Sequence, residues 1–241
     1  MEKENLIVQM LEAGLHFGHQ KSKRHPKMDP YIFMIRNGVA ILDLQKTEEK
    51  LKEAMDFAAA IASRAGQILF LGSKRQAQGA VAESAIQARM PYATKRWLGG
   101  TFTNFDVIQK KINRLRTLER EEKADDWKKY TKKERLSLAR EKKKLEAIVG
   151  GLKSLEKMPQ AIFIIDIMTE KNAIAEARKK KVPIIALVDS NSNPELVDYP
   201  IPGNDDAIRG IKFICDKISA AIMEGQKSQA VKARGAELKT K

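Results

Sequence analysis

The chain of 241 residues contains one cysteine, three histidines and two tryptophans. A single cysteine cannot form an intramolecular disulfide, and Cys215 falls in the apolar helical run IKFICDKISAAI, which predicts a buried thiol rather than a nucleophile. The sequence has no apolar run of about 18 residues, and MEKENLIVQMLEAG lacks the pattern of a signal peptide. We therefore expect no membrane span and a cytoplasmic location.

The glycine motifs that bind nucleotide phosphates are also missing. The stretch ILFLGSKRQAQ predicts a strand, a glycine turn at Gly72 and a helix, but neither G-x-G-x-x-G nor G-x-x-x-x-G-K-[ST] is present. Ser73 is predicted to cap this helix, with Lys74 and Arg75 in its first turn. A phosphate contact and an ordinary capped helix with solvated cations are both consistent with this pattern.

Four aspartates are the best candidates for catalysis or for a structural cation. Asp166 and Asp189 are predicted to end strands, and Asp205 and Asp206 to open the last helix. The carboxyl ends of parallel strands are where α/β proteins bind ligands. No histidine lies in that half of the chain to complete an acid–base set, which argues against an enzyme. A cation near Asp189 and Asp205 remains an open alternative.

The charge is strongly positive. Lysine and arginine outnumber aspartate and glutamate 45 to 31, which gives a net charge of +14 and a pI of about 9.7. This excess predicts a polyanionic partner, most simply nucleic acid. An anionic membrane surface is the alternative, but the basic segments lack the bulky apolar anchors of a membrane-surface helix.

Hydrophobic periodicity predicts an α/β fold. The runs YIFMI and VAILDL flank Arg36-Asn37-Gly38, and an Asn-Gly pair between apolar runs predicts an antiparallel hairpin. Further along, QILFLG, AIFIID and PIIALVD are predicted buried strands and PYATKRW a short one, while helices are predicted over residues 47–65, 74–88, 169–181 and 205–224. This alternation predicts a parallel sheet with helices on both faces.

The alternation is interrupted over residues 105–157. Apolar residues recur there every three or four positions in two series, Phe105, Ile108, Ile112, Leu115, Leu118 and Leu138, Leu145, Ile148, Leu152, Leu155. The joining segment EREEKADDWKKYTKKER is dense in charge, so we expect an antiparallel coiled-coil helical hairpin that projects from the body. Two ordinary helices lying on the sheet are the alternative.

These patterns divide the chain into four segments. Residues 1–104 form the first part of the α/β body with a basic N-terminal loop, and residues 105–157 form the projecting hairpin. Residues 158–224 complete the body. Residues 225–241, GQKSQAVKARGAELKTK, have few large apolar side chains and are predicted to be a basic flexible tail.

Two segments place cations beside aromatic rings. HFGHQKSKRHPKMDPYIF, residues 16–33, contains all three histidines, but Gly18 and Pro26 interrupt any helix that would align them, and no fourth zinc ligand is visible. KRWLGGTFTNF combines two cations, three aromatic rings and a glycine pair, a combination that suits folded RNA. The alternative for the rings is that Trp97 and Phe105 are core residues.

Several long motifs carry a family resemblance. LEAGLHFGHQKSKRHPKM, ILDLQKT, RWLGGTFTNF, PQAIFIID and VPIIALVDSNSNPELVDYPIPGNDDAIRGI resemble the bacterial ribosomal protein S2 family, the second protein of the small ribosomal subunit. The resemblance runs from about Leu6 to Glu224. It implies a flavodoxin-like sheet with a protruding coiled-coil hairpin, and a structural protein with no enzymatic activity and no cofactor.

The resemblance also implies a place and partners. Members of the family lie where the head and body of the small subunit meet, near the messenger exit region, and contact ribosomal RNA. They help dock other small-subunit proteins, including ribosomal protein S1, and so support translation initiation. The candidate RNA-binding residues are His19, Lys21, Lys23, Arg24, His25, Lys27, Tyr31, Arg36, Asn37, Lys74, Arg75, Lys95, Arg96, Trp97, Gly99, Gly100, Thr101, Thr103 and Asn104.

The sequence departs from the family pattern at two places. Met34-Ile35 stands before the Arg-Asn-Gly turn where bacterial members usually carry a Gly-Glu pair, which removes a flexible, acidic point beside the basic loop. Thr101-Phe102 stands where a Met-Leu or similar pair is common.

Overall fold

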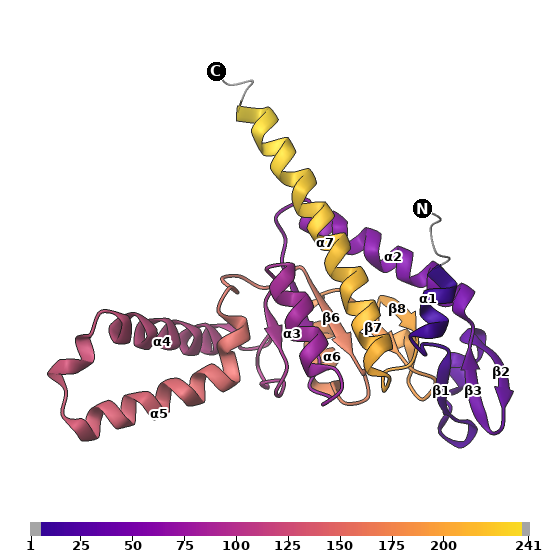
Figure 1. The fold of residues 1–241 in the computed structure, drawn as a ribbon, viewed down its shortest axis with the longest axis horizontal. Coiled ribbons are helices and arrows are strands. Elements are labelled where there is room, and N and C mark those ends of the chain that lie inside the picture. Colours follow the sequence, from indigo (N-terminus) through magenta and orange to yellow (C-terminus); the bar gives the residue numbers. More distant parts are fainter. Residues whose placement is uncertain (1–5, 238–241) are drawn as a thin grey trace.

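The computed structural model describes residues 6–237 and contains two β-sheets (Figure 1). The smaller sheet is antiparallel, with the order β1-β3-β2, and consists of β1 (Phe17–Gln20), β2 (Ile32–Arg36) and β3 (Val39–Leu42). The larger sheet is parallel throughout and consists of β4 (Ile68–Leu71), β5 (Tyr92–Ala93), β6 (Ala161–Ile165), β7 (Ile184–Val188) and β8 (Tyr199–Pro202).

The strand order of the larger sheet is β5-β4-β6-β7-β8. Counted from β4, this is the order 2-1-3-4-5 of flavodoxin-like proteins, in which the chain reverses its direction across the sheet after the first two strands. The predicted flavodoxin-like parallel sheet is therefore confirmed. The carboxyl ends of β4, β6, β7 and β8 all open onto one edge, which is where ligands of this architecture bind.

Helices connect the strands and form two layers. They are α1 (Leu6–Glu12), α2 (Leu44–Ala62), α3 (Gln78–Gln87), α4 (Phe105–Lys123), α5 (Lys132–Val149), α6 (Lys171–Lys180) and α7 (Ile208–Glu237). Short 3-10 helices are η1 (Lys21–Lys23), η2 (Pro26–Tyr31), η3 (Asp126–Lys129), η4 (Gly150–Leu152) and η5 (Pro194–Leu196). None of the described helices is long and apolar enough to cross a bilayer.

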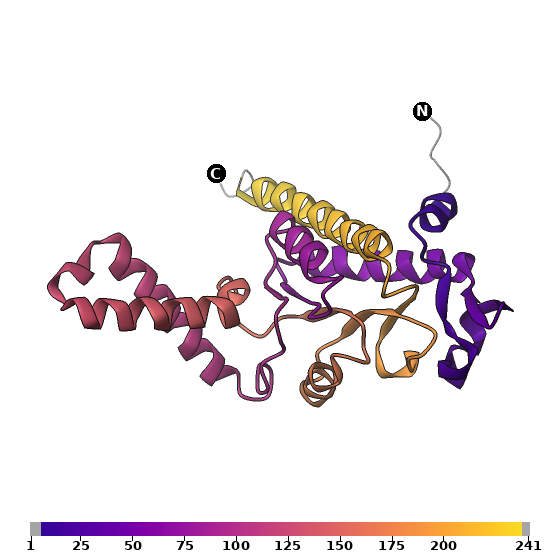
Figure 2. The same cartoon turned by 60° about the horizontal axis from the view of Figure 1, so that its bottom comes forward.

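Successive residues of the parallel strands supply two hydrophobic cores. Phe70 and Phe163 are fully buried among side chains of α2, α3 and α7, whereas Leu71 and Ile164 are fully buried among side chains of α6 and the start of α4. Figure 2 shows α2 and α7 on one side of the sheet and α6 on the other. Because both faces are covered, these strands are apolar throughout rather than alternating.

The predicted β2–β3 hairpin is confirmed. Asn37 and Gly38 both have positive φ, 50° and 76°, as a two-residue type I′ turn requires. β1 adds a third strand that we did not predict. The sheet docks at the carboxyl edge of the parallel sheet, where the His25 N–H donates to the Ser190 carbonyl at 2.8 Å and the His19 N–H to Ser190 Oγ at 2.7 Å.

α4 and α5 form the predicted helical hairpin, which projects from one end of the body (Figure 1). Ile108, Ile112 and Leu115 on α4 are buried, and near its base the hairpin joins the same core as β4 and β6. Thr131 begins α5 with a capping box, in which its hydroxyl accepts from the Glu134 N–H and the Glu134 carboxylate accepts from the Thr131 N–H at 2.8 Å.

Several helix ends differ from the prediction. α2 begins at Leu44 because the Asp43 carboxylate caps it by accepting from the Gln45 N–H at 3.0 Å. α3 begins at Gln78, so Ser73 is not its N-cap; the chain turns through residues 74–77, and Lys74 points into the carboxyl edge instead.

The last helix is predicted to begin at Asp205 and end at Glu224. It begins at Ile208, after a loop, and continues to Glu237. The added residues are mainly good helix formers, and extending an existing helix costs no new nucleus. Residues 238–241 of the predicted tail lie outside the described residues.

Candidate nucleic-acid interface

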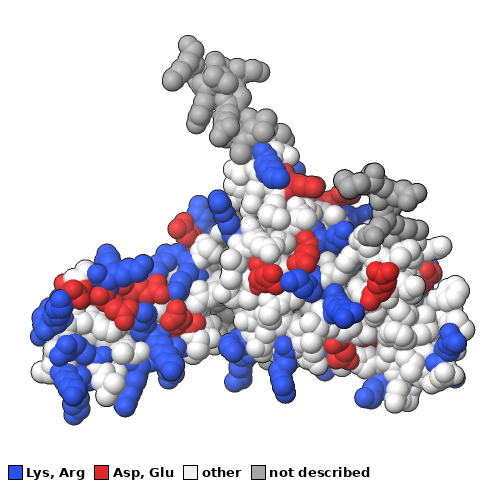
Figure 3. Space-filling model, viewed as in Figure 1, with Lys and Arg blue, Asp and Glu red and all other residues white. Residues whose placement is uncertain are grey.

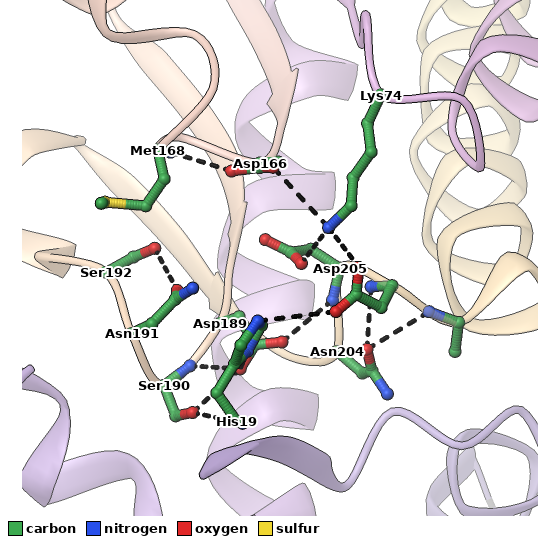
Figure 4. Close-up of polar contacts among 12 residues, drawn as sticks. His19, Lys74, Asp166, Met168, Asp189, Ser190, Asn191, Ser192, Asn204 and Asp205 are labelled. Atoms are coloured by element: carbon green, nitrogen blue, oxygen red, sulfur yellow. Dashed lines mark hydrogen bonds and ion pairs between the residues drawn. The ribbon is translucent and has the colours of Figure 1, made fainter. Parts of the chain in front are cut away.

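Charged side chains from five segments meet at the carboxyl edge of the parallel sheet (Figure 4). They follow β4, β6, β7 and β8, and one comes from β1. We call this group the carboxyl-edge cluster, and its members are His19, Lys74, Asp166, Glu170, Asp189, Asp205 and Asp206.

Lys74 lies at the centre of the cluster. Its Nζ is 2.7 Å from Asp205 Oδ1, 2.6 Å from Asp206 Oδ1 and 3.6 Å from Asp166 Oδ2. Burial lowers the pKa of Lys74, but the hydrogen bonds to Asp205 and Asp206 outweigh burial and raise the pKa overall. The Lys74 ammonium is therefore held inside the protein by carboxylates, whereas the neighbouring Arg75 side chain is exposed.

Asp205 carries the strongest perturbation of any carboxylate in the cluster. It is 1% exposed, and burial together with repulsion from Asp166 and Asp189 raises its pKa to about 7, against the attraction of Lys74. The cluster holds more carboxylates than cations, and this excess of negative charge opposes ionisation of the buried Asp205.

His19 enters the cluster from β1. Its Nδ1 is 3.1 Å from Asp189 Oδ1, and its Nε2 is 3.5 Å from Asp206 Oδ2. The hydrogen bond to Asp189 raises the pKa of His19, partly opposed by burial. The half of the chain that carries these aspartates contains no histidine, yet His19 reaches them from the other half. The fold joins residues that no local pattern connects.

The three histidines do not converge. The Nδ1 atom of His16 is buried without a hydrogen-bond partner among the described residues, and His25 Nδ1 accepts from the Lys27 N–H at 3.2 Å. His19, Asp205 and Asp206 instead form the group whose ligand atoms, all within 4.8 Å of one another, could hold a metal ion. Such an ion would compete with the Lys74 ammonium for both aspartates.

The turn after β4 does not resemble a phosphate site. The Ser73 N–H, which a phosphate would need, donates to Glu170 Oε1 at 3.1 Å, and Glu170 is 3% exposed. A Cβ on Gly72 would lie 2.9 Å from Val81 Cγ2, so this glycine serves the packing of α3 against β4. A nucleotide phosphate would also face the carboxylates of the cluster, which argues against the nucleotide-binding hypothesis.

Part of the N-terminal basic segment is exposed and free of carboxylates. Lys21, Lys23 and Arg36 are exposed, and among the described residues no carboxylate forms an ion pair with them. Asn37 is exposed in the hairpin turn, while Tyr31 is half-buried against the core.

Two cations of this segment have internal partners. Arg24 Nε lies 3.3 Å from Asp29 Oδ1, and Lys27 Nζ lies 2.7 Å from Glu195 Oε1. These pairs are largely solvent-exposed, so each contributes little to stability and can be exchanged for a phosphate.

A single carboxylate holds the second basic loop, the segment KRWLGGTFTNF at residues 95–105, in place. Glu176 on α6 accepts hydrogen bonds of 2.7–3.1 Å from four N–H groups and one hydroxyl: Trp97 Nε1, the backbone amides of Gly100, Phe102 and Thr103, and Thr103 Oγ1. Burial raises the pKa of Glu176, but these hydrogen bonds together lower the pKa by more than burial raises it. The pKa of Glu176 is therefore lowered overall. Sequence reasoning missed Glu176, because nothing around it distinguishes it from a surface residue.

The rings of this loop belong to the core. Trp97 is 6% and Phe102 1% exposed, and they pack edge to face with ring centroids 5.0 Å apart. The alternative that assigned the rings of Trp97 and Phe105 to the core is therefore correct for Trp97, whereas Phe105 is only partly buried against the same core. Lys95 and Arg96 are exposed, as are Gly99 and Asn104.

The departures from the family pattern fall in different environments. Met34 and Ile35, on the edge strand β2, are 46% and 36% exposed, so the change there makes an outer edge more apolar. Thr101 and Phe102 are buried; Thr101 Oγ1 donates to the Leu98 carbonyl at 2.6 Å.

The two basic segments do not form one patch. Lys95 and Arg96 follow β5, at one edge of the parallel sheet, whereas the N-terminal segment docks beyond β7 near the other edge. Four strand spacings separate the edges, about 19 Å. A ligand that contacts both must be extended, as folded RNA is.

The helical hairpin carries much of the excess charge (Figure 3). Residues 105–157 contain 17 lysines and arginines against 10 aspartates and glutamates, a net charge of +7, half that of the whole chain. Five of these cations pair with carboxylates, for example Arg114 with Glu141 at 2.8 Å. The other twelve, all within the described residues, have no ion-pair partner: Lys110, Lys111, Arg116, Arg120, Lys123, Lys132, Lys133, Arg135, Arg140, Lys143, Lys144 and Lys157.

Comparison with protein families agrees with this picture. A family model described as ribosomal protein S2 matches residues 10–225, which includes both basic segments, the carboxyl-edge cluster and the hairpin. Proteins of this family are structural components of the small ribosomal subunit and not enzymes, and they associate with its RNA and proteins. The predicted resemblance is confirmed, and the chain belongs to the ribosomal protein S2 family.

Proposed function

We propose that this protein binds small-subunit ribosomal RNA through three groups of cations. These are Lys21, Lys23 and Arg36 of the N-terminal segment, Lys95 and Arg96 after β5, and the unpaired cations of the hairpin. The observation that carries the proposal is that these side chains lack ion-pair partners among the described residues, whereas Lys74 is neutralised internally. Unpaired exposed cations release counterions from RNA when they bind phosphate.

The loop geometry supports the same proposal. Glu176 fixes the backbone of residues 100–103, and the rings of Trp97 and Phe102 anchor the loop in the core. Lys95 and Arg96 directly precede the buried Trp97, so the segment that carries these two cations is anchored at that residue. Preorganised donors lose less entropy on binding than donors of a disordered loop.

We also propose that the protein acts at the junction of head and body near the messenger exit region. There it would dock neighbouring proteins, including ribosomal protein S1, and so support initiation. Family membership supports this, as does the exposed apolar edge of β2, where Phe33 is 72% and Met34 46% exposed. An apolar edge of this kind suits a protein neighbour better than RNA phosphates.

The test is incorporation of variants into small subunits, measured by co-sedimentation at moderate salt. We expect the combined replacement of Lys21, Lys23, Arg24 and Lys27 by alanine to preserve folding and impair incorporation. Because Arg24 and Lys27 have internal partners, the Lys21/Lys23 double variant should account for most of the loss. The slope of log affinity against log salt should fall by roughly 0.7–0.9 for each phosphate contact removed.

A charge-matched control is replacement of Lys52 and Lys212 by alanine. Both are exposed lysines paired with glutamates on α2 and α3, and both lie outside the basic segments. Normal incorporation of the folded quadruple variant, or an equal defect in the control, would show that the N-terminal segment is not a main RNA surface.

A further inference from the structure

A small pocket lies where the chain leaves β5 and where α5 returns to the body. Its volume is about 240 Å³. One wall comes from Tyr92 and the following residues to Arg96, and the other from the end of α5 and η4, including Ala147 and Gly151. The pocket is therefore formed jointly by the sheet edge and the base of the hairpin, and its lining includes the exposed cations Lys95 and Arg96.

The contact between these walls is close. A Cβ on Gly151 would lie 2.7 Å from Tyr92 Cδ2, so only glycine allows η4 to approach the Tyr92 ring this closely. Tyr92 is held in turn by β5, which pairs with β4. Tyr92 is thus held by its packing against η4 and against the core, so this part of the pocket lining exists before any ligand binds.

The mouth of the pocket is positively charged on one side. Lys95 and Arg96 line it, are exposed and have no ion-pair partner among the described residues. Lys153, on the opposite side, is held by Glu119 at 2.5 Å and Glu146 at 3.5 Å. Two free cations next to an aromatic wall are the combination that binds one nucleotide, with the base inside and the phosphate at the rim.

We infer that this pocket holds a single unpaired base of the RNA, whose phosphate lies against Lys95 and Arg96. The inference rests on the proposed RNA-binding function and assigns one contact within it. Size agrees, since a cavity of about 150 Å³ accommodates benzene. Unpaired bases splayed out of loops and bulges are what proteins recognise most specifically in RNA.

The test fills the pocket without changing its charge. Ala147 is exposed on α5 and lines the pocket, so Ala147→Phe places a ring inside it. Ala139→Phe adds the same ring at an exposed position of the same helix that does not line the pocket, and serves as the matched control. Small subunits are reconstituted with 4-thiouridine-substituted ribosomal RNA and irradiated, and crosslinked protein segments are identified by mass spectrometry.

We expect a crosslink between one nucleotide and residues 92–96 of the unaltered protein. Its yield should fall about tenfold in Ala147→Phe and stay unchanged in Ala139→Phe, with equal thermal stability of both variants. Crosslinks of the N-terminal segment and the hairpin should persist in Ala147→Phe. The salt dependence of binding should also persist, because no phosphate contact is removed.

Four results would overturn the inference. An undiminished crosslink in Ala147→Phe would place the base elsewhere, and so would the absence of any crosslink at residues 92–96 while other segments crosslink normally. Saturable binding of free uridine monophosphate by the isolated protein, abolished by Ala147→Phe, would indicate a metabolite site instead. Absence of crosslinks from every segment would overturn the proposed RNA binding itself, and the pocket assignment with it.

Discussion

The carboxyl-edge cluster and the helical hairpin use the same types of charged side chain in opposite ways. In the cluster, Lys74 lies within 3.6 Å of three aspartates, and Asp166, Asp189 and Asp205 are buried. In the hairpin, twelve cations face outward without an ion-pair partner among the described residues. The charged side chains of the cluster therefore stabilise the body, whereas the cations of the hairpin remain available to a partner. The two sets differ in their burial and pairing and not in residue type.

The largest effect on stability is expected from Lys74→Ala. Removing one partner of a buried ion pair leaves carboxylates uncompensated, so the free energy of unfolding should fall by about 3–5 kcal/mol at pH 8, measured by urea denaturation. Arg75→Ala, at the exposed neighbouring position, should change it by less than about 0.5 kcal/mol. Equal effects of the two variants would mean that Lys74 contributes no more to the free energy of unfolding than an exposed cation does.

Glu176→Ala tests whether the second basic loop depends on an anion from the body. Loss of five hydrogen bonds to one carboxylate should reduce the free energy of local opening by about 2 kcal/mol. Amide hydrogen exchange at Gly100, Phe102 and Thr103 should accelerate about 30-fold. Glu224→Ala, at an exposed position of α7, should leave these rates unchanged, and unchanged rates in Glu176→Ala would contradict the role of Glu176.

The cluster should also make stability depend on pH. The pKa of Asp205 is raised to about 7, so between roughly pH 4 and pH 7 the folded protein holds a proton that the unfolded chain has lost. A proton bound only by the folded protein stabilises the fold, and this contribution to the free energy of unfolding is lost as the pH rises through 7. The raised pKa values of His19 and Glu170 act in the same direction, and the lowered pKa of His16 opposes them.

We expect the free energy of unfolding to be about 1–2 kcal/mol lower at pH 8 than at pH 5. Asp205→Asn should flatten this dependence, whereas Asp56→Asn, at an exposed position of α2, should retain it. The measurement is denaturant unfolding across the pH range. An unchanged dependence in Asp205→Asn would assign the titration to another group.

The smallest effect on stability is expected from trimming the hairpin. No residue in 119–137 is buried, so replacing residues 120–133 by a short Gly/Ser turn removes no core contact. The free energy of unfolding of the body should change by less than about 1 kcal/mol, or about 2–4 °C in Tm. A large loss of Tm in a calorimetric scan would show that the hairpin and the body unfold as one cooperative unit, and that the hairpin also stabilises the body.

Local sequence patterns were enough to predict most of the fold. Apolar strands alternating with amphipathic helices predicted the parallel sheet, Asn37-Gly38 predicted the β2–β3 hairpin, and three- and four-residue spacing predicted α4 and α5. β8 was missed because Pro200 and Pro202 argue against a strand, although prolines are tolerated on an edge strand such as this one.

The candidate site was less predictable, because its chemistry depends on contacts across the chain. Lys74 was a candidate for phosphate, and its partners, Asp205 and Asp206, are 131 or more residues away in sequence. The same holds for His19 with Asp189, and for Trp97 with Glu176. Exposure and pairing decide which cations are free, and no local pattern encodes either.

The docking of the N-terminal sheet onto the ends of β7 and β8 has a consequence for synthesis. The β2–β3 hairpin can form as soon as it has been translated, but His19 and the Leu15 carbonyl can contact Asp189, Asn204 and Asp206 only after those residues have also been translated. Such contacts must close a loop of most of the chain, which slows folding. The lysines of this segment therefore leave the translating ribosome well before the residues of β7 and β8 that fix the position of the segment.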